Sequence, residues 1–143
     1  MTAKPDSQKP SSGQRALAGE FYVCSLLCRM GYDVALTLGN AKAVDITVYN
    51  NKGKAICVQV KTTLKGHDWL VGKDFPSRGD ILIALVRLGE HLDRNPELYV
   101  LRPEQLVVEV PSAKHAPRVR RSAVTKAVND HDLSPIRARL GSA

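Results

Sequence analysis

The pattern of hydrophobic and polar positions predicts a β-hairpin in the middle of the chain. Residues 44–49 alternate apolar and polar side chains, as a strand with one buried face does. Residues 54–61 form a second run of β-forming residues. Between them, Asn51-Lys52-Gly53 suits a three-residue loop that ends in a left-handed glycine.

This turn fixes which side chains meet across the hairpin. If Asn50 faces Lys54, then Asp45 stands opposite Gln59. Side chains alternate along a strand, so Gln59 and Lys61 are expected on the same face as Asp45. The other face is apolar, with Ile46, Val48, Val58 and Val60. A two-residue loop would shift the register and break this convergence, so the prediction depends on the turn type.

A helix is predicted over residues 14–30, with Ser11 or Ser12 as N-cap and Gly31 as the stop. At about 100° per residue, one face of this helix is apolar. Its members are Leu17, Phe21, Cys24, Leu27 and Cys28. Glu20, directly after Gly19, falls within that apolar stripe. A buried glutamate is costly without a partner, so we expect a cation or a lysine beside it.

The second half of the chain is expected to complete a mixed sheet. Residues 80–86 form a nearly continuous apolar run, typical of a central strand covered on both faces. Residues 98–101 predict a further strand, and Pro103 can begin a short helix or turn. Residues 65–79 read as a loop with at most a short strand around Trp69. Trp69 would either cap the edge of the core, which we favour, or stack on a nucleic-acid base. The predicted organisation is one α/β domain over residues 14–143, preceded by a flexible Lys-, Pro- and Ser-rich arm over residues 1–13.

These residues resemble the PD-(D/E)XK nuclease superfamily, whose members share the restriction-endonuclease-like fold. The resemblance covers about Gly19 to Thr63: Gly19-Glu20 in the helix, Val44-Asp45-Ile46 in one strand and Val58-Gln59-Val60-Lys61 in the next. Within the superfamily, the general look of these residues is similar to the Holliday-junction resolvase-like branch and to the small intron- or phage-associated branch. The resemblance implies a mixed central sheet flanked by helices and a Mg²⁺- or Mn²⁺-dependent endonuclease.

Carried over by position, the resemblance assigns a role to each residue of the hairpin site. Asp45 would be the main metal ligand, Lys61 the catalytic lysine and Glu20 an outer ligand or a water-holding group. Gln59 departs from the family, which usually has Asp or Glu there. Its amide oxygen and the backbone carbonyl of Val60 can still bind a hard cation. The site would then contain two carboxylates instead of three, and its affinity for the metal ion would be lower.

The net charge of the chain indicates what kind of partner it binds. The chain carries a formal charge of +7. From Ser112 onward it has seven basic residues against two acids, and Arg118-Val119-Arg120-Arg121 is expected to lead into a helix with a basic ridge. Basic surfaces bind nucleic acid by releasing counterions from phosphate. We therefore expect DNA contacts from Lys65, Arg118, Arg120 and Arg121, although such residues are also commonly just a solvated face.

The remaining features exclude other classes of protein. There is no apolar run long enough to span a membrane and no export signal, and three cysteines predict free thiols in a cytoplasmic protein. The four histidines show no metal-ligand spacing. Two alternatives to a nuclease stay open: a nuclease-like protein that binds nucleic acid after losing cleavage with Gln59, and a protein-interaction module on the same scaffold. Symmetric cutting of two strands would call for a homodimer, yet the sequence pattern indicates no self-complementary apolar surface.

Overall fold

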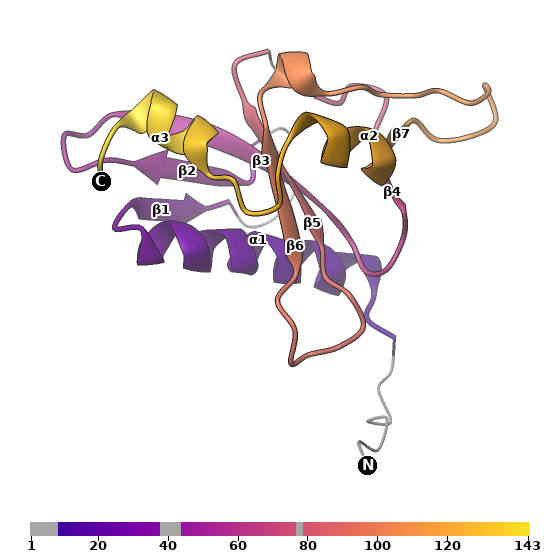
Figure 1. The fold of residues 1–143 in the computed structure, drawn as a ribbon, viewed down its shortest axis with the longest axis horizontal. Helices are drawn as coiled ribbons and strands as arrows, with labels where there is room; N and C mark the ends of the chain where they lie inside the picture. The colour runs from indigo at the N-terminus through magenta and orange to yellow at the C-terminus, as the bar shows by residue number, and fades with distance from the viewer. Residues whose placement is uncertain (1–8, 38–43, 77–78) are drawn as a thin grey trace.

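In the computed structural model, which describes residues 9–37, 44–76 and 79–143, a mixed β-sheet forms the centre of the molecule (Figure 1). In chain order the elements are α1 (Ser12–Arg29), β1 (Asp33–Leu36), β2 (Ile46–Tyr49), β3 (Ala55–Thr63), β4 (Asp68–Leu70), β5 (Leu82–Arg87), β6 (Glu97–Leu101), the 3₁₀ helix η1 (Pro103–Gln105), β7 (Arg118–Arg120), α2 (Arg121–Ala127) and α3 (Ser134–Leu140). None of the helices among these residues is long and apolar enough to cross a membrane.

The sheet order is β1-β2-β3-β5-β6. The first three strands form an antiparallel meander, β3 and β5 run parallel, and β6 returns antiparallel to β5. Strands β4 and β7 pair with each other in a separate two-stranded sheet. The predicted mixed α/β architecture is confirmed.

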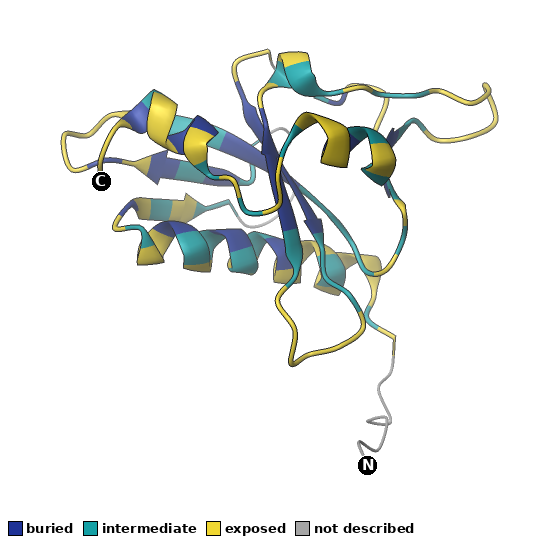
Figure 2. Ribbon diagram, in the orientation of Figure 1, coloured by how far each residue is buried: buried dark blue, intermediate teal, exposed yellow. Residues whose placement is uncertain are grey.

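Each face of the sheet has its own hydrophobic core. On one face, side chains of the strands pack with Val23 and Leu27 of α1 and with Ile136 and Leu140 of α3. On the other face, strand residues pack under the β4–β7 sheet and α2. β5 contributes to both cores, with Leu82 and Ala84 on one side and Ile83 and Leu85 on the other. Figure 2 shows this strand buried along its length, as its continuous apolar sequence predicts.

Local signals place both ends of α1. Ser11 is the N-cap: its hydroxyl accepts from the Gln14 N–H, and the Gln14 side chain accepts from the Ser11 N–H. Gly31, with φ +94°, ends the helix as expected. The arm was predicted to extend too far along the chain, because Ser12 and Gly13 already belong to α1. Residues 1–8 of that arm lie outside the described residues.

The predicted apolar stripe of α1 was wrong in its orientation. The helix buries Gly19, Val23 and Leu27, whereas Phe21 and Cys28, which the sequence placed in the stripe, are exposed. The reason is steric. Gly19 lets the helix approach β3 closely, so the buried face is centred on the Gly19–Val23 side. Leu27 of the predicted stripe is still buried and Cys24 packs on the core, while Leu17, Phe21 and Cys28 face solvent.

The structure corrects two further predictions about the secondary-structure elements. β2 begins at Ile46, so Val44 and Asp45 precede the strand. The basic segment from Arg118 forms strand β7 before α2 begins, because it pairs with β4, a segment too distant in sequence for local periodicity to reveal. Trp69 of β4 is 1% exposed and donates its indole N–H to the Val86 carbonyl, which confirms its place in the core.

Candidate active site

The β2–β3 hairpin has the register that the turn predicts. Asn50 N–H donates to the Lys54 carbonyl over 3.0 Å, and Gly53 has φ +81°. Ile46 pairs with Val58, which places Asp45 opposite Gln59. The sequence analysis missed the role of Asn50 itself. Its side chain accepts from two N–H groups of the turn and donates to the Leu140 carbonyl at 2.8 Å, so it also fastens the hairpin to α3.

Asp45 lies where β2 and β3 separate. Its Oδ2 accepts the Val60 N–H at 2.7 Å, in place of a main-chain acceptor that a continued β2 would supply. This bond holds the carboxylate against the peptide between Gln59 and Val60. The N–H and C=O of a strand residue point to the same edge, so the Val60 carbonyl faces Asp45 as well. The main chain thus offers one more oxygen at this position.

Glu20 reaches the same place from α1. The side chains of Glu20 and Asp45 are within hydrogen-bonding contact, and burial together with the Asp45 charge raises the pKa of Glu20 above its usual 4.5. Gly19 makes this approach possible, because a Cβ there would lie 1.8 Å from Thr62 Oγ1. Among the residues that the structure describes, neither carboxylate makes an ion pair.

Gln59 and Lys61 occupy the opposite face of β3 from Val58 and Val60, which belong to the core under α1. Gln59 is 9% exposed, and Lys61 Nζ lies 5.6 Å from the centre of the Phe75 ring. The strand register sets Gln59 beside Ile83 and Lys61 beside Leu85 of β5. The amide and the ammonium therefore project from a largely apolar surface next to the edge where Asp45 sits.

The oxygen donors on and beside this stretch of β3 are of the kinds that bind a hard divalent cation. They are the carboxylates of Asp45 and Glu20, the Gln59 amide and the Val60 carbonyl, which are the ligand types that Mg²⁺ prefers. Over residues 9–37, 44–76 and 79–143 no cluster of three or more His, Cys, Asp or Glu side chains could hold a metal. Glutamine at position 59 leaves this site with two carboxylates.

The basic residues predicted to bind nucleic acid are all in ion pairs. Lys65 pairs with Glu90 at 2.9 Å, and both side chains are well exposed. The arginines at 118, 120 and 121 pair with Asp68, Glu109 and Glu97. Exposed ion pairs are weak and exchange readily for other partners. The buried part of this network, at Glu97, has a structural role, since it also accepts from Arg87 and Tyr99.

A groove of about 420 Å³ lies between the N-terminal end of α1 and the end of β3. Its basic side chains are Lys9, Arg15 and Lys65, with Asp68 as its acidic one. The groove also includes Thr62 and Thr63, which directly follow Lys61 in β3. Sequence analysis identified Lys65 and missed the other two cations, because nothing in the local pattern brings the start of α1 to the end of β3.

Comparisons with known proteins agree with this architecture. No protein-family profile matches the sequence, and no curated protein matches it. Among solved structures, the chain is similar to the Holliday junction resolvase of Archaeoglobus fulgidus, an archaeal hyperthermophile, with a TM-score of 0.58 and 12% identity over 87% of this chain and 97% of that one. It is also similar to a bacterial homing endonuclease, with a TM-score of 0.55 and 17% identity over 90% of this chain and 93% of that one.

The structural similarity thus extends over nearly the whole chain, beyond the hairpin and α1. Both similar structures match the mixed sheet with its flanking helices. At these identities the likeness is one of fold. The chain has a restriction-endonuclease-like fold, as the sequence predicts.

Proposed function

We propose that this protein is a Mg²⁺- or Mn²⁺-dependent endonuclease that hydrolyses phosphodiester bonds in DNA, including structured or branched DNA. The observation that carries the proposal is the contact between the Glu20 and Asp45 carboxyl groups at the edge of β3, with Lys61 on the same strand. Two carboxyl groups in contact repel each other when ionised, so the pair gains most from a bound cation. The names of the two similar structures, a Holliday junction resolvase and a homing endonuclease, favour DNA as substrate.

Asp45, Glu20, Gln59 and the Val60 carbonyl would hold the cation, with Glu20 as an outer ligand or the holder of a water. A bound Mg²⁺ polarises the phosphoryl group, lowers the pKa of the attacking water and stabilises the charge on the leaving oxygen. Asp45 keeps one oxygen for this purpose, since the other accepts the Val60 N–H. Because Gln59 brings no negative charge, we expect the substrate phosphate to complete the binding of metal.

Lys61 has two roles open to it. Its ammonium can neutralise charge that develops on the phosphate, or the amine can orient and deprotonate the attacking water. The Phe75 ring below Nζ restricts where the side chain can extend. Beyond the site, the groove with Lys9, Arg15 and Lys65 leads away from the end of β3 and offers positive charge to a DNA strand.

Cleavage of plasmid and four-way-junction DNA tests the proposal, with Mg²⁺ or Mn²⁺ added to wild type, Asp45→Asn and Lys61→Ala. Asparagine retains an acceptor for the Val60 N–H, so Asp45→Asn removes charge while keeping the local hydrogen bond. Lys52→Ala, in the exposed hairpin turn, is the matched control. We expect metal-dependent nicking in wild type and Lys52→Ala and a loss of about 100-fold or more in the two site variants. Equal activity in all four proteins would refute the site.

The second candidate function is nucleic-acid binding without cleavage, and Gln59 is the observation that favours it. If wild type is inactive with both metals yet retards DNA in a gel, the binding function replaces the nuclease. Gain of nicking by Gln59→Glu would then identify the glutamine as the cause. Absence of both cleavage and DNA binding at low salt would leave a protein-interaction module.

A further inference from the structure

The side chain of Lys61 lies over an aromatic ring and not beside an acid. Its Nζ is 5.6 Å from the centre of the Phe75 ring, within the distance at which the negative face of an aromatic ring attracts a cation. Among the residues that the structure describes, Lys61 makes no ion pair and no side-chain hydrogen bond. The attraction of the ring is therefore what holds this ammonium in place.

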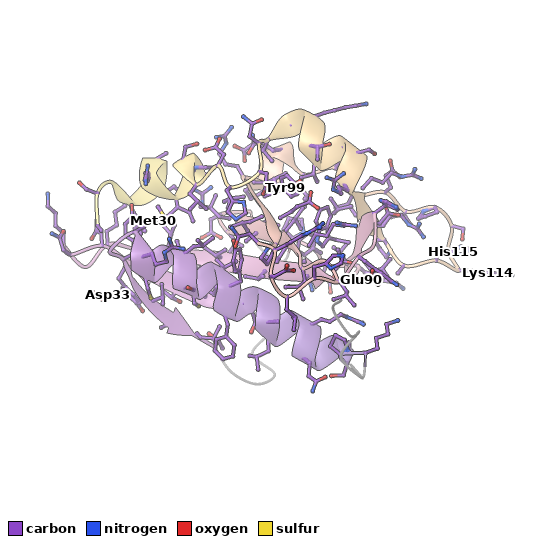
Figure 3. All side chains as sticks on the ribbon, turned by 60° about the horizontal axis from the view of Figure 1, so that its bottom comes forward. Met30, Asp33, Glu90, Tyr99, Lys114 and His115 are labelled. Atoms are coloured by element: carbon purple, nitrogen blue, oxygen red, sulfur yellow. The ribbon has the colours of Figure 1, made fainter. Side chains whose placement is uncertain are left out.

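This position differs from that of an ordinary surface lysine. Such a lysine lays its methylene chain on the protein and extends its ammonium into water. Lys114 is of this kind, on an exposed loop at the edge of the molecule (Figure 3). Lys61 is half-buried, and it extends from the face of β3 that turns toward the core under the β4–β7 sheet.

Phe75 is itself firmly fixed. Its side chain is 8% exposed and belongs to the core under the β4–β7 sheet. Its N–H donates to the Gly72 carbonyl over 3.2 Å. Just before this turn, Val71 is 5% exposed and donates its N–H to the Pro117 carbonyl over 2.9 Å. Packing and hydrogen bonds thus fix the ring, whereas a lysine side chain by itself is long and flexible.

We infer that Phe75 is a positioning residue that holds Nζ of Lys61 in place for the reaction. The inference rests on the proposed function, in which Lys61 acts on the phosphate or on the attacking water. A flexible lysine must be ordered before it can act, and ordering it costs conformational entropy. A ring that orders the side chain in advance removes this cost from the reaction. Such a ring favours a cation over its face by about 2- to 30-fold.

The position of Phe75 in the core gives it a packing role as well, and fluorine separates the two roles. An aromatic ring attracts a cation because its face is negative and its edge positive. Fluorine atoms on the ring draw electrons outward, so each added fluorine weakens the negative face while the shape of the ring changes little. A packing role is therefore insensitive to the number of fluorines, whereas the hold on Lys61 weakens with each one.

Fluorine NMR tests the contact directly. The chain has two phenylalanines, Phe21 and Phe75, so protein made with para-fluorophenylalanine gives two signals, and Phe21→Leu assigns them. Lys61→Met keeps the length of the side chain and removes its charge, and we expect it to shift the signal of the ring at position 75 alone. Lys52→Met, in the exposed hairpin turn, is the control and should shift neither signal. An unchanged signal at position 75 in Lys61→Met would overturn the inference.

Cleavage kinetics test whether the held lysine serves the reaction. Phenylalanine analogues with one, two or three ring fluorines are placed at position 75, and DNA cleavage is measured with Mg²⁺. We expect kcat to fall stepwise, by about tenfold at three fluorines, with KM nearly unchanged, because the fluorines alter the position of Nζ and not the binding of DNA. The trifluoro analogue at position 21, where the ring is 54% exposed, is the matched control and should leave kcat unchanged.

The two measurements separate this inference from the proposed function. A protein that cleaves DNA with the same kcat throughout the series retains the nuclease function and loses the positioning role of Phe75. If wild type does not cleave DNA, the proposed function fails, and the fluorine signal, which needs neither DNA nor metal, decides whether Phe75 holds Lys61. Urea unfolding of each variant confirms that the protein with the altered ring is folded.

Discussion

Replacing Gly19 with alanine tests how α1 is held against β3 and how Glu20 is brought to Asp45. A Cβ at position 19 would lie 1.8 Å from Oγ1, 2.9 Å from Cβ and 3.0 Å from Cγ2 of Thr62. Rotation of the threonine side chain cannot relieve this overlap, because its Cβ and Cγ2 also lie too close. The helix must move away from the strand or Thr62 must be displaced.

Two opposing effects set the size of the change. In the middle of a helix, alanine is favoured over glycine by about 1 kcal/mol. Overpacking a tight contact costs about 1–3 kcal/mol, and an overlap this severe belongs at the upper end. We therefore expect Gly19→Ala to lower the free energy of unfolding by about 2 kcal/mol. Any outward movement of α1 also withdraws Glu20, so cleavage should fall with stability.

Urea unfolding followed by circular dichroism measures the effect. Gly13→Ala is the matched control in the same helix, where the new Cβ meets only Ser11 Oγ at 3.9 Å. We expect it to be neutral or slightly stabilising. Thr62→Ala removes the two outer clashing atoms, Oγ1 and Cγ2, and leaves only the Cβ contact at 2.9 Å. The Oγ1 hydroxyl that it removes is buried without a hydrogen-bond partner among the described residues. The double variant should regain much of the lost stability, with a coupling free energy of at least about 1 kcal/mol.

Two results would refute this reasoning. One is a Gly19→Ala protein at least as stable as wild type, which would mean that the helix is free to move. The other is a double variant whose loss equals the sum of the two single losses, which would separate position 19 from Thr62.

Three further predictions concern charge. Burial and the charge of Asp45 raise the pKa of Glu20 in the folded state, so its contribution to stability is full near pH 4 and is lost as pH rises through the raised pKa. The free energy of unfolding of Glu20→Gln, measured in urea, should therefore rise relative to that of wild type between pH 4 and pH 7. A difference that does not change with pH would contradict this. Burial alone would raise the pKa of Glu97, but hydrogen bonds from Arg121, Tyr99 and Arg87 lower it, so its contribution is present at neutral pH and is lost as pH falls through the lowered pKa. Glu97→Gln should cost about 2 kcal/mol at pH 7 and progressively less below pH 4, and an equal cost at both would count against the ion-pair explanation. Gln59→Glu adds a third carboxylate and should tighten Mg²⁺ binding by about tenfold in calorimetry, with unchanged affinity arguing against a metal at this position.

Local signals in the sequence determined the parts of this protein whose partners are near in the chain. The Asn51-Lys52-Gly53 turn sets the hairpin register, because a left-handed glycine at its end permits one pairing of the two strands. The capping residues around Ser11 and Gly31 fix the ends of α1 for the same reason. The apolar run at β5 marks a strand buried on both faces, whatever its neighbours are. Asp45 opposite Gln59, with Lys61 two residues further on, follows from these rules.

Only the tertiary structure decided how distant segments meet. Periodicity gave α1 an apolar stripe, but the fit of Gly19 against Thr62 turns that helix, so that Val23 is buried and Phe21 faces solvent. The same fit brings Glu20 to Asp45. Arg118 and Arg120 lie on a strand because β4 is available to pair with them, about fifty residues earlier in the chain. Local pattern records which residues prefer burial or a given backbone shape, whereas contacts between distant segments depend on which surfaces fit together without overlap.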